Sequence, residues 1–301
     1  MIIKSVTGVE LYSDNSDQMR ETIENAVKAG INIENSDYSN LDLERVILTG
    51  VSLSGCNFEN TNLSFSDLKG CNMNNSKLRC TNLFGANLKG AIMRDVDMSG
   101  ANFSNSIVQS VDFRSTRTWT AKVINAVFVN ANLQSSTFAN MQFLNCEFSN
   151  SNLKNTAIRY IDFNSCNMER SDFSESKMHK VSFIESVLKN GNFRAVDMTK
   201  CEMYSCDIRD TFIGYTTISL NCGFRNNKTS ESQRTFIASF LYKWLENADC
   251  LTEYEEKLKQ FISGYASDER YNAAVNHQQR IEDQVIGCEF VSYVDDEETS
   301  N

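Results

Sequence analysis

The chain has 301 residues, a net charge of −10, 41% hydrophobic residues and no proline. No stretch approaches the ~18 apolar residues that a membrane-spanning helix needs. The opening residues, MIIKSVTGVELYS, lack a long apolar run and a small-residue cleavage site, so we expect no signal peptide and a cytoplasmic location.

Residues 1–30 are predicted to form a cap made of a strand and a helix. Ile2–Tyr12 is rich in β-forming residues, Ser16 is the expected N-cap of the helix, and Gly30 is its expected C-terminal stop. One apolar stripe runs along the helix: Met19, Ile23 and Val27. A repeat array leaves its first coil exposed, so a terminal unit that covers it is expected.

Residues 31–220 repeat with a period of five. From Ile33 to Ile218 there are 38 consecutive positions spaced five apart, and all are apolar except Thr118, which is clearly polar, and Tyr38, which is partly so. We call these positions slots. A period of five fits neither the 3.6 residues of an α-helix turn nor the two of a strand, so it predicts a solenoid.

Units such as TNLFG, ANLKG, SDLKG, ANFSN and SDFSE recur in this segment. They resemble the pentapeptide-repeat family, whose pattern is a small residue, Asn or Asp, Leu or Phe, and two variable residues. The resemblance implies an all-β solenoid, a right-handed quadrilateral β-helix with four units per coil and about nine coils in this chain. The slot residue should pack on the axis, the small residue should point inward, and the other three should face outward or shape the turn.

The repeat also explains most of the cysteines and many of the aspartates. Six of the ten cysteines lie two residues before a slot: Cys56, Cys71, Cys146, Cys166, Cys201 and Cys206. Ser, Ala, Thr and Val fill the equivalent positions, so these cysteines should be buried and reduced. Asp alternates with Asn directly before the slots, which suits a turn better than acid catalysis. No catalytic motif or metal-ligand spacing occurs, so we expect no enzyme, no metal and no cofactor.

Residues 221–301 leave the period and predict an α-helical region that ends in an acidic tail, VDDEETSN. Helical spacing over 230–247 places four apolar side chains on one stripe: Phe236, Phe240, Leu241 and Trp244. This stripe either covers the last coil and its helical neighbours or forms a dimer, as terminal helices do in several pentapeptide-repeat proteins. We expect a homodimer whose interface is formed by residues 230–262.

The resemblance also implies DNA mimicry as a function, because the Qnr and MfpA proteins present an acidic rod to DNA gyrase. The charge distribution here argues against it. Residues 31–220 carry 18 basic and 19 acidic groups, whereas residues 221–301 carry 8 and 15. A DNA surrogate needs a dense anionic stripe, since duplex phosphates recur every ~1.7 Å of axis.

Residues 20 apart should stack, so the outward side chains can be sorted by face. The face centred on Tyr38 and every slot 20 residues further on, which we call face A, carries 7 basic and 4 acidic groups. Candidate partner-binding residues on or beside it are basic or aromatic: Arg79, Arg117, Trp119, Lys122, Arg159, Tyr160, Lys177 and His179. The alternative is chance scatter of charge on a solvated rod.

The segment Arg114–Lys122 contains the polar slot Thr118. Either a bulge turns Trp119 inward in place of Thr118, or an exposed loop presents Trp119 between Arg117 and Lys122.

We therefore predict a non-catalytic binding or inhibitory module that presents a rigid surface to a protein partner. The alternative is a DNA mimic acting on gyrase, a topoisomerase or another DNA-binding enzyme, and a third class is an enzyme with an unrecognised site in residues 221–301. We expect no direct contact with nucleic acid or a membrane.

Overall fold

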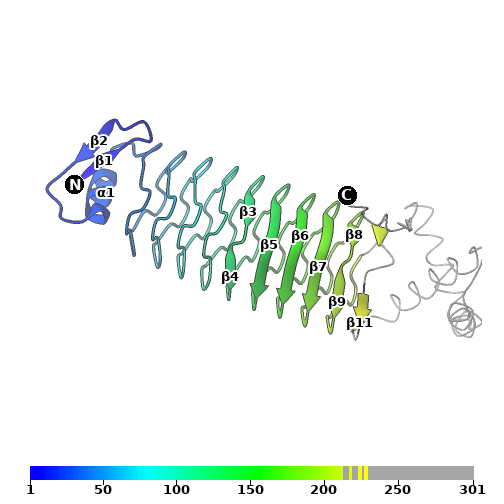
Figure 1. Ribbon diagram of the computed structural model, residues 1–301. Helices are drawn as coiled ribbons and strands as arrows, with labels where there is room; N and C mark the ends of the chain where they lie inside the picture. Colours follow the sequence, from blue (N-terminus) through cyan, green and yellow to red (C-terminus); the bar gives the residue numbers. More distant parts are fainter. Residues whose placement is uncertain (213–216, 219–222, 226, 230–301) are drawn as a thin grey trace, which may run out of the picture.

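A computed structural model describes residues 1–212, 217–218, 223–225 and 227–229. Its backbone forms a parallel ladder in which a residue pairs with the one 20 positions later, from Asp37↔Asn57 to Met198↔Ile218. Four five-residue units therefore make one coil. The coils stack side by side into a β-solenoid, and the N-terminal elements cover one end (Figure 1).

The four faces of the solenoid are named by their slots. Face A contains Tyr38, face B Leu43, face C Leu48 and face D Leu53, each with the slots that follow at 20-residue spacing. Every slot from Ile33 to Met203 is buried, as the period predicts.

At several units, the small residue two positions before the slot donates a hydrogen bond to the neighbouring coil. The Thr61 hydroxyl donates to the carbonyl oxygen of Tyr38 at 2.6 Å, and the Cys71 thiol donates in the same way to Leu48 at 2.8 Å. Cysteine thus replaces Ser or Thr as a small inward donor. All six predicted cysteines are buried and free, which confirms their interpretation.

Phenylalanine slots stack from coil to coil in the later part of the array. The ring centroids of Phe128 and Phe148 are 4.6 Å apart and nearly parallel, and those of Phe143 and Phe163 are 5.0 Å apart. These distances match the spacing of neighbouring strands, about 4.8 Å, so the rings fill the axis without breaking the ladder.

The polar residue before the slot shapes the turn, as expected for the Asp and Asn positions. The N–H of Lys69 donates to Asp67 Oδ1 at 3.2 Å, and the N–H of Ser99 donates to Asp97 Oδ1 at 3.0 Å. The last residue of a unit, such as Asn60 or Asn75, has a positive φ, where Asn and Gly are the least strained residues.

From Arg117 onward, the tight turns of faces A and B give way to extended backbone. β-forming residues follow the slots there, such as Trp119, Ile124 and Leu144, and they favour strands. The resulting strands are β3 (Arg117–Trp119), β4 (Lys122–Ile124), β5 (Thr137–Leu144), β6 (Ala157–Asn164), β7 (Lys177–Ile184), β8 (Asp197–Thr199) and β9 (Glu202–Tyr204). β5, β6 and β7 each run through a corner, so faces A and B share one parallel sheet.

The N-terminal cap contains two strands where the sequence predicts one. β1 (Ile2–Lys4) pairs antiparallel with β2 (Glu10–Ser13). Gly8, at φ 84, lies in the connecting turn, where it can adopt this conformation without strain. The N–H of Asp37 donates to the carbonyl of Lys4 at 2.8 Å, so the hairpin is tied to the first coil. This contact covers backbone that would otherwise form an open edge.

The helix α1 (Met19–Lys28) follows the hairpin, with Gln18 as its N-cap, so the prediction of Ser16 as the cap is wrong. The Ser16 hydroxyl instead donates to Asp14, whose carboxylate also accepts from Thr22 and Asn25. The hydrogen bond from Asn25, followed by those from Thr22 and Ser16, holds the pKa of Asp14 well below its ordinary value despite partial desolvation.

The predicted apolar stripe and helix stop are confirmed. Ile23 is fully buried, and Met19 and Val27 pack against the core beside it. Gly30 has φ 72, and the N–H of Ile31 donates to the carbonyl of Ala26 at 3.0 Å, which is the pattern of a glycine C-terminal cap.

The ladder continues past residue 220. β10 (Thr217–Ile218) pairs with β8 at a 20-residue offset, but β11 (Gly223–Arg225) pairs with β9 at an offset of 21. One extra residue therefore lies between β10 and β11, and the five-residue period stops there although the pairing reaches Lys228. The stripe at Phe236–Trp244, the proposed dimer and the domain boundaries stay predictions, because residues 230–301 lie outside the described part. No helix in the described ranges is long and apolar enough to cross a membrane.

Cysteine labelling in the native state tests the inward position of the small residue. Burial raises the pKa of Cys56 and of Cys71 to about 12, whereas Cys80 is exposed. We expect iodoacetamide to modify Cys80 rapidly and the six buried cysteines only after denaturation, because burial keeps the reagent from their sulfur atoms. Peptide mass spectrometry measures this directly. Native labelling of Cys56 or Cys71 at the rate of Cys80 would contradict the inward placement.

Candidate interaction surface

Trp119 lies on the outside of face A and Thr118 fills the slot beneath it. Trp119 is 53% exposed and Thr118 is 2% exposed. β3 pairs in unbroken register with β5, with Thr118 opposite Phe138 and Trp119 opposite Ala139. Neighbouring side chains of a strand point to opposite sides, so this register fixes Trp119 outward. The inward alternative for Trp119 is therefore wrong, and its outward position is on a strand rather than on a loop.

The inward position of Thr118 is unfavourable. Its Oγ1 has no hydrogen-bond partner in the described chain, and it borders a void of about 20 Å³ lined by apolar side chains such as Phe113 and Val123. A buried hydroxyl without a partner costs about 1–3 kcal/mol.

Thr120 adds a second departure from the repeat. It has φ 56, a conformation that β-branched residues rarely adopt, and its hydroxyl donates to the carbonyl of Trp119 at 2.7 Å. Thr118 and Thr120 thus each depart from the pattern of the array, on either side of the exposed Trp119. Such departures concentrate at functional or strained sites.

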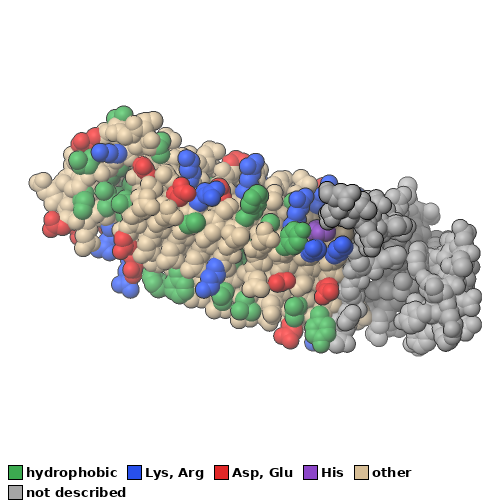
Figure 2. Space-filling model, in the orientation of Figure 1, with side chains coloured by type: hydrophobic (Ala, Val, Ile, Leu, Met, Phe, Trp, Pro, Cys, Tyr) green, Lys and Arg blue, Asp and Glu red, His purple; other side chains and the backbone are tan. Residues whose placement is uncertain are grey.

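Two to four coils further along face A, basic and aromatic side chains form a second group, which we call the basic cluster. Its members are Arg159, Tyr160, Lys177, His179, Lys180 and Lys200. The ladder places Arg159 beside His179, whose ring meets the Tyr160 ring edge-on at 5.6 Å. Lys180 Nζ lies 5.1 Å from the centre of the Tyr160 ring. Figure 2 shows basic side chains gathered around a histidine near the C-terminal end of the described solenoid.

The basic cluster has a positive field. Partial burial lowers the pKa of His179, and the neighbouring charges of Lys180, Lys200 and Arg159 lower it further. His179 is therefore neutral at pH 7. Asp197 stands next to Lys177 in the ladder, but within the described ranges no carboxylate lies at ion-pair distance from Arg159, Lys177 or Lys180. The cluster is suited to an anionic partner.

The structure separates the candidates named from the sequence. Arg117 and Trp119 share β3, and Arg159, Tyr160, Lys177 and His179 join the basic cluster. Arg79 lies between Glu59 and Asp97, at 3.7 and 3.6 Å, so its charge is locally balanced. Lys122 belongs to β4 on face B. Lys180 and Lys200 also belong to the cluster; the 20-residue spacing places both among the seven basic groups of face A, although neither is among the candidate partner-binding residues.

The ladder, the buried slots and the turn chemistry define a β-solenoid built from five-residue units. The family model for pentapeptide repeats matches this chain in 8 copies, over residues 29–64, 56–95, 81–117, 126–163 and 151–190. These ranges cover more than half of the sequence. The chain belongs to the pentapeptide-repeat family.

Solved structures with a similar fold include HetL, a pentapeptide repeat protein involved in heterocyst differentiation regulation from the cyanobacterium Nostoc sp. strain PCC 7120. It is 15% identical, with 69% of this chain and 93% of that chain covered and a TM-score of 0.32. A trypsin-treated form of QnrB1, a plasmid-mediated fluoroquinolone resistance protein, is 19% identical, with 66% and 93% covered and a TM-score of 0.37. At such identities the likeness concerns the fold alone. No curated protein matches the sequence.

Replacement of the polar slot tests the energetic cost of Thr118. We expect Thr118→Val to stabilise the protein by about 1–2 kcal/mol, because it removes an unpaired buried hydroxyl and keeps the side-chain shape. The midpoint of chemical denaturation measures this. The matched control is Thr61→Val, which removes a hydroxyl that donates at 2.6 Å and should destabilise. A loss of stability in Thr118→Val would show that Thr118 Oγ1 has a partner in solution.

Proposed function

We propose that this protein is a non-catalytic binding module whose face A docks an acidic protein partner. The observation that carries the proposal is Trp119, half exposed on β3 beside Arg117 and on the same face as the basic cluster. Trp, Tyr and Arg are the residues that most often dominate the binding energy of protein interfaces. Because the ladder is rigid, its backbone loses little conformational entropy when these residues bind a partner.

The dimensions of face A suit such a contact. Arg117 and Lys200 are separated by four strand spacings, or about 20 Å at ~4.8 Å each. Trp119 and Tyr160, 53% and 49% exposed, supply apolar contact area within this span. The basic groups around them would steer an acidic partner toward the face and set its register.

The local strain at Thr118 and Thr120 supports the same proposal. Thr118 buries a hydroxyl without a partner and Thr120 is a β-branched residue at a positive φ, two features that cost free energy, and both residues flank the exposed Trp119. A sequence selected only for a stable solenoid would place an apolar residue in the slot and Asn or Gly at the turn. DNA mimicry finds less support, because face A is net basic and a DNA surrogate must be anionic.

Affinity capture with face A variants tests the proposal. We expect Trp119→Ala and Arg117→Glu each to reduce recovery of the partner at least about tenfold, the effect of losing a hot-spot residue. Matched controls on other faces are Phe65→Ala, which removes an equally exposed aromatic ring, and Lys89→Glu, which reverses an exposed charge. The controls should recover the partner as the native chain does. Equal recovery by all four variants would contradict the proposal.

The titration of His179 provides an independent check of the partner's charge. An acidic partner stabilises the imidazolium, so binding should raise the depressed pKa of His179 toward or above its ordinary value. Proton NMR of the imidazole in the free and bound protein measures the shift, and a His179→Gln variant assigns the signal. A pKa that is unchanged or lower in the complex would contradict an acidic partner at the basic cluster.

A further inference from the structure

A surface depression lies at the corner where face D meets face A. It has a volume of about 310 Å³ and is lined by the two residues that follow three successive slots of face D: Arg94 and Asp95, Arg114 and Ser115, Gln134 and Ser135. All six side chains are polar. Ser115 is only two residues before Arg117, but the depression opens at a different corner from the Trp119 surface.

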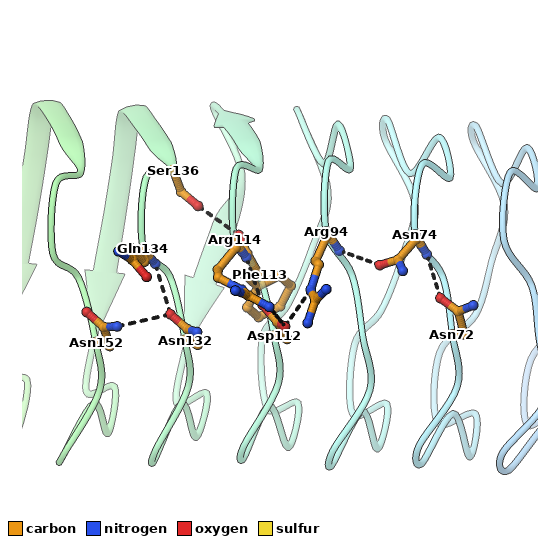
Figure 3. Close-up of polar contacts among 10 residues, drawn as sticks. All are labelled: Asn72, Asn74, Arg94, Asp112, Phe113, Arg114, Asn132, Gln134, Ser136 and Asn152. Atoms are coloured by element: carbon orange, nitrogen blue, oxygen red, sulfur yellow. Dashed lines mark hydrogen bonds and ion pairs between the residues drawn. The ribbon is translucent and has the colours of Figure 1, made fainter.

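One carboxylate holds both arginines in place (Figure 3). Arg94 Nε donates to Asp112 Oδ2 at 2.7 Å, and Arg114 donates from Nε and Nη2 to the two oxygens of Asp112 at 3.0 and 2.9 Å. Partial burial acts to raise the pKa of Asp112, but the hydrogen bonds from Arg114 and Arg94 lower it more. Asp112 therefore stays ionised at neutral pH and fixes two guanidinium groups from neighbouring coils.

A break in the repeat lies beside this arrangement. Asn72 and Asn132 each accept the N–H of the residue two positions later, which closes their turns. Two equivalent residues lie between them: Asp112, which accepts the N–H of Arg114 in the same way, and Ile92, which has no such acceptor. The Arg94 N–H donates instead to Asn74 Oδ1 of the preceding coil, and its side chain turns toward Asp112 of the following coil.

The two guanidinium groups keep unused donors. Asp112 engages only Nε of Arg94, and Nε and Nη2 of Arg114, so the other Nη groups have no acceptor within the described chain. The side chains of Arg94 and Arg114 are 45% and 38% exposed, against 19% for Asp112. The solvent-facing side of this pair is therefore richer in donors than in acceptors.

We propose that this depression is an oxyanion site that binds a phosphate or carboxylate group between Arg94 and Arg114. Arginine pairs suit such groups because each guanidinium offers planar, parallel N–H donors. The hydroxyl of Ser115 and the amide of Gln134 line the same space and can donate further hydrogen bonds. Asp95 also lines it and opposes an anion, so it limits the affinity. The proposal does not depend on the function assigned to face A.

NMR titration of the full chain with inorganic phosphate, and separately with acetate, tests the site. We expect saturable shifts of the Nε–H signals of Arg94 and Arg114. Arg94→Gln and Arg114→Gln should each weaken binding at least about tenfold, because each removes charge-assisted hydrogen bonds. Asp95→Asn should tighten it, since it removes the opposing charge and keeps the shape. Binding of phosphate alone identifies a phosphate site, and binding of both anions extends the site to carboxylates.

The matched control is Arg209→Gln. Arg209 makes the same kind of pair with Asp207, with Nε–Oδ1 at 2.8 Å, but lies outside the depression on face C. It should leave phosphate binding unchanged. Absence of saturable shifts at millimolar phosphate, or an equal loss of affinity in Arg209→Gln, would overturn the proposal. Denaturation curves of each variant separate lost binding from lost folding, and the second arginine variant replaces the first if that one unfolds.

Discussion

The in-register hydrogen bonding of each residue with the residue 20 positions later is the constraint on which the rest of this molecule depends. It fixes which side chains point inward, and it places outward side chains in columns about 4.8 Å apart. The inward positions must then be filled by one large and one small residue per unit. The Phe stacks and the thiol and hydroxyl donors to the previous coil meet that need. The hairpin β1–β2 and the helix α1 protect the first coil, which has no preceding neighbour.

This regularity makes the exceptions informative. Ile92 offers no turn acceptor, so the Arg94 N–H donates to Asn74 of the preceding coil, and the Arg94 side chain pairs with Asp112 of the next coil. Thr118 puts a hydroxyl into the apolar axis, directly beneath the exposed ring of Trp119. Neither substitution disturbs the backbone register, since the ladder runs unbroken through both. Local chemistry on this solenoid can therefore change from coil to coil while the scaffold stays the same, which is the property that a binding module needs.

Much of the fold could be predicted from the sequence because one period governs both burial and stacking. The inward slots, the buried cysteines and the turn role of Asp and Asn follow from it. Features that depend on individual contacts could not be predicted. Ser16 looked like a helix cap, but Asp14 competes for its hydroxyl. The extra residue before β11 ended the visible period although the pairing continues to Lys228. Predicting the outward position of Trp119 requires knowledge of the register of β3 against β5. Predicting the depression requires knowledge of the side-chain directions of Arg94 and Arg114. The 20-residue spacing nevertheless predicts correctly that most residues of the basic cluster lie together on face A.

The proposed function requires an outward Trp119 that contacts a partner, and the fluorescence of this residue tests that requirement most directly. The chain has 2 tryptophans, so Trp244→Phe leaves Trp119 as the only emitter. We expect emission typical of a solvated indole that acrylamide quenches readily, and protection from acrylamide when the proposed acidic partner binds. Blue-shifted emission that resists acrylamide in the free protein, or quenching that the partner leaves unchanged, would contradict it.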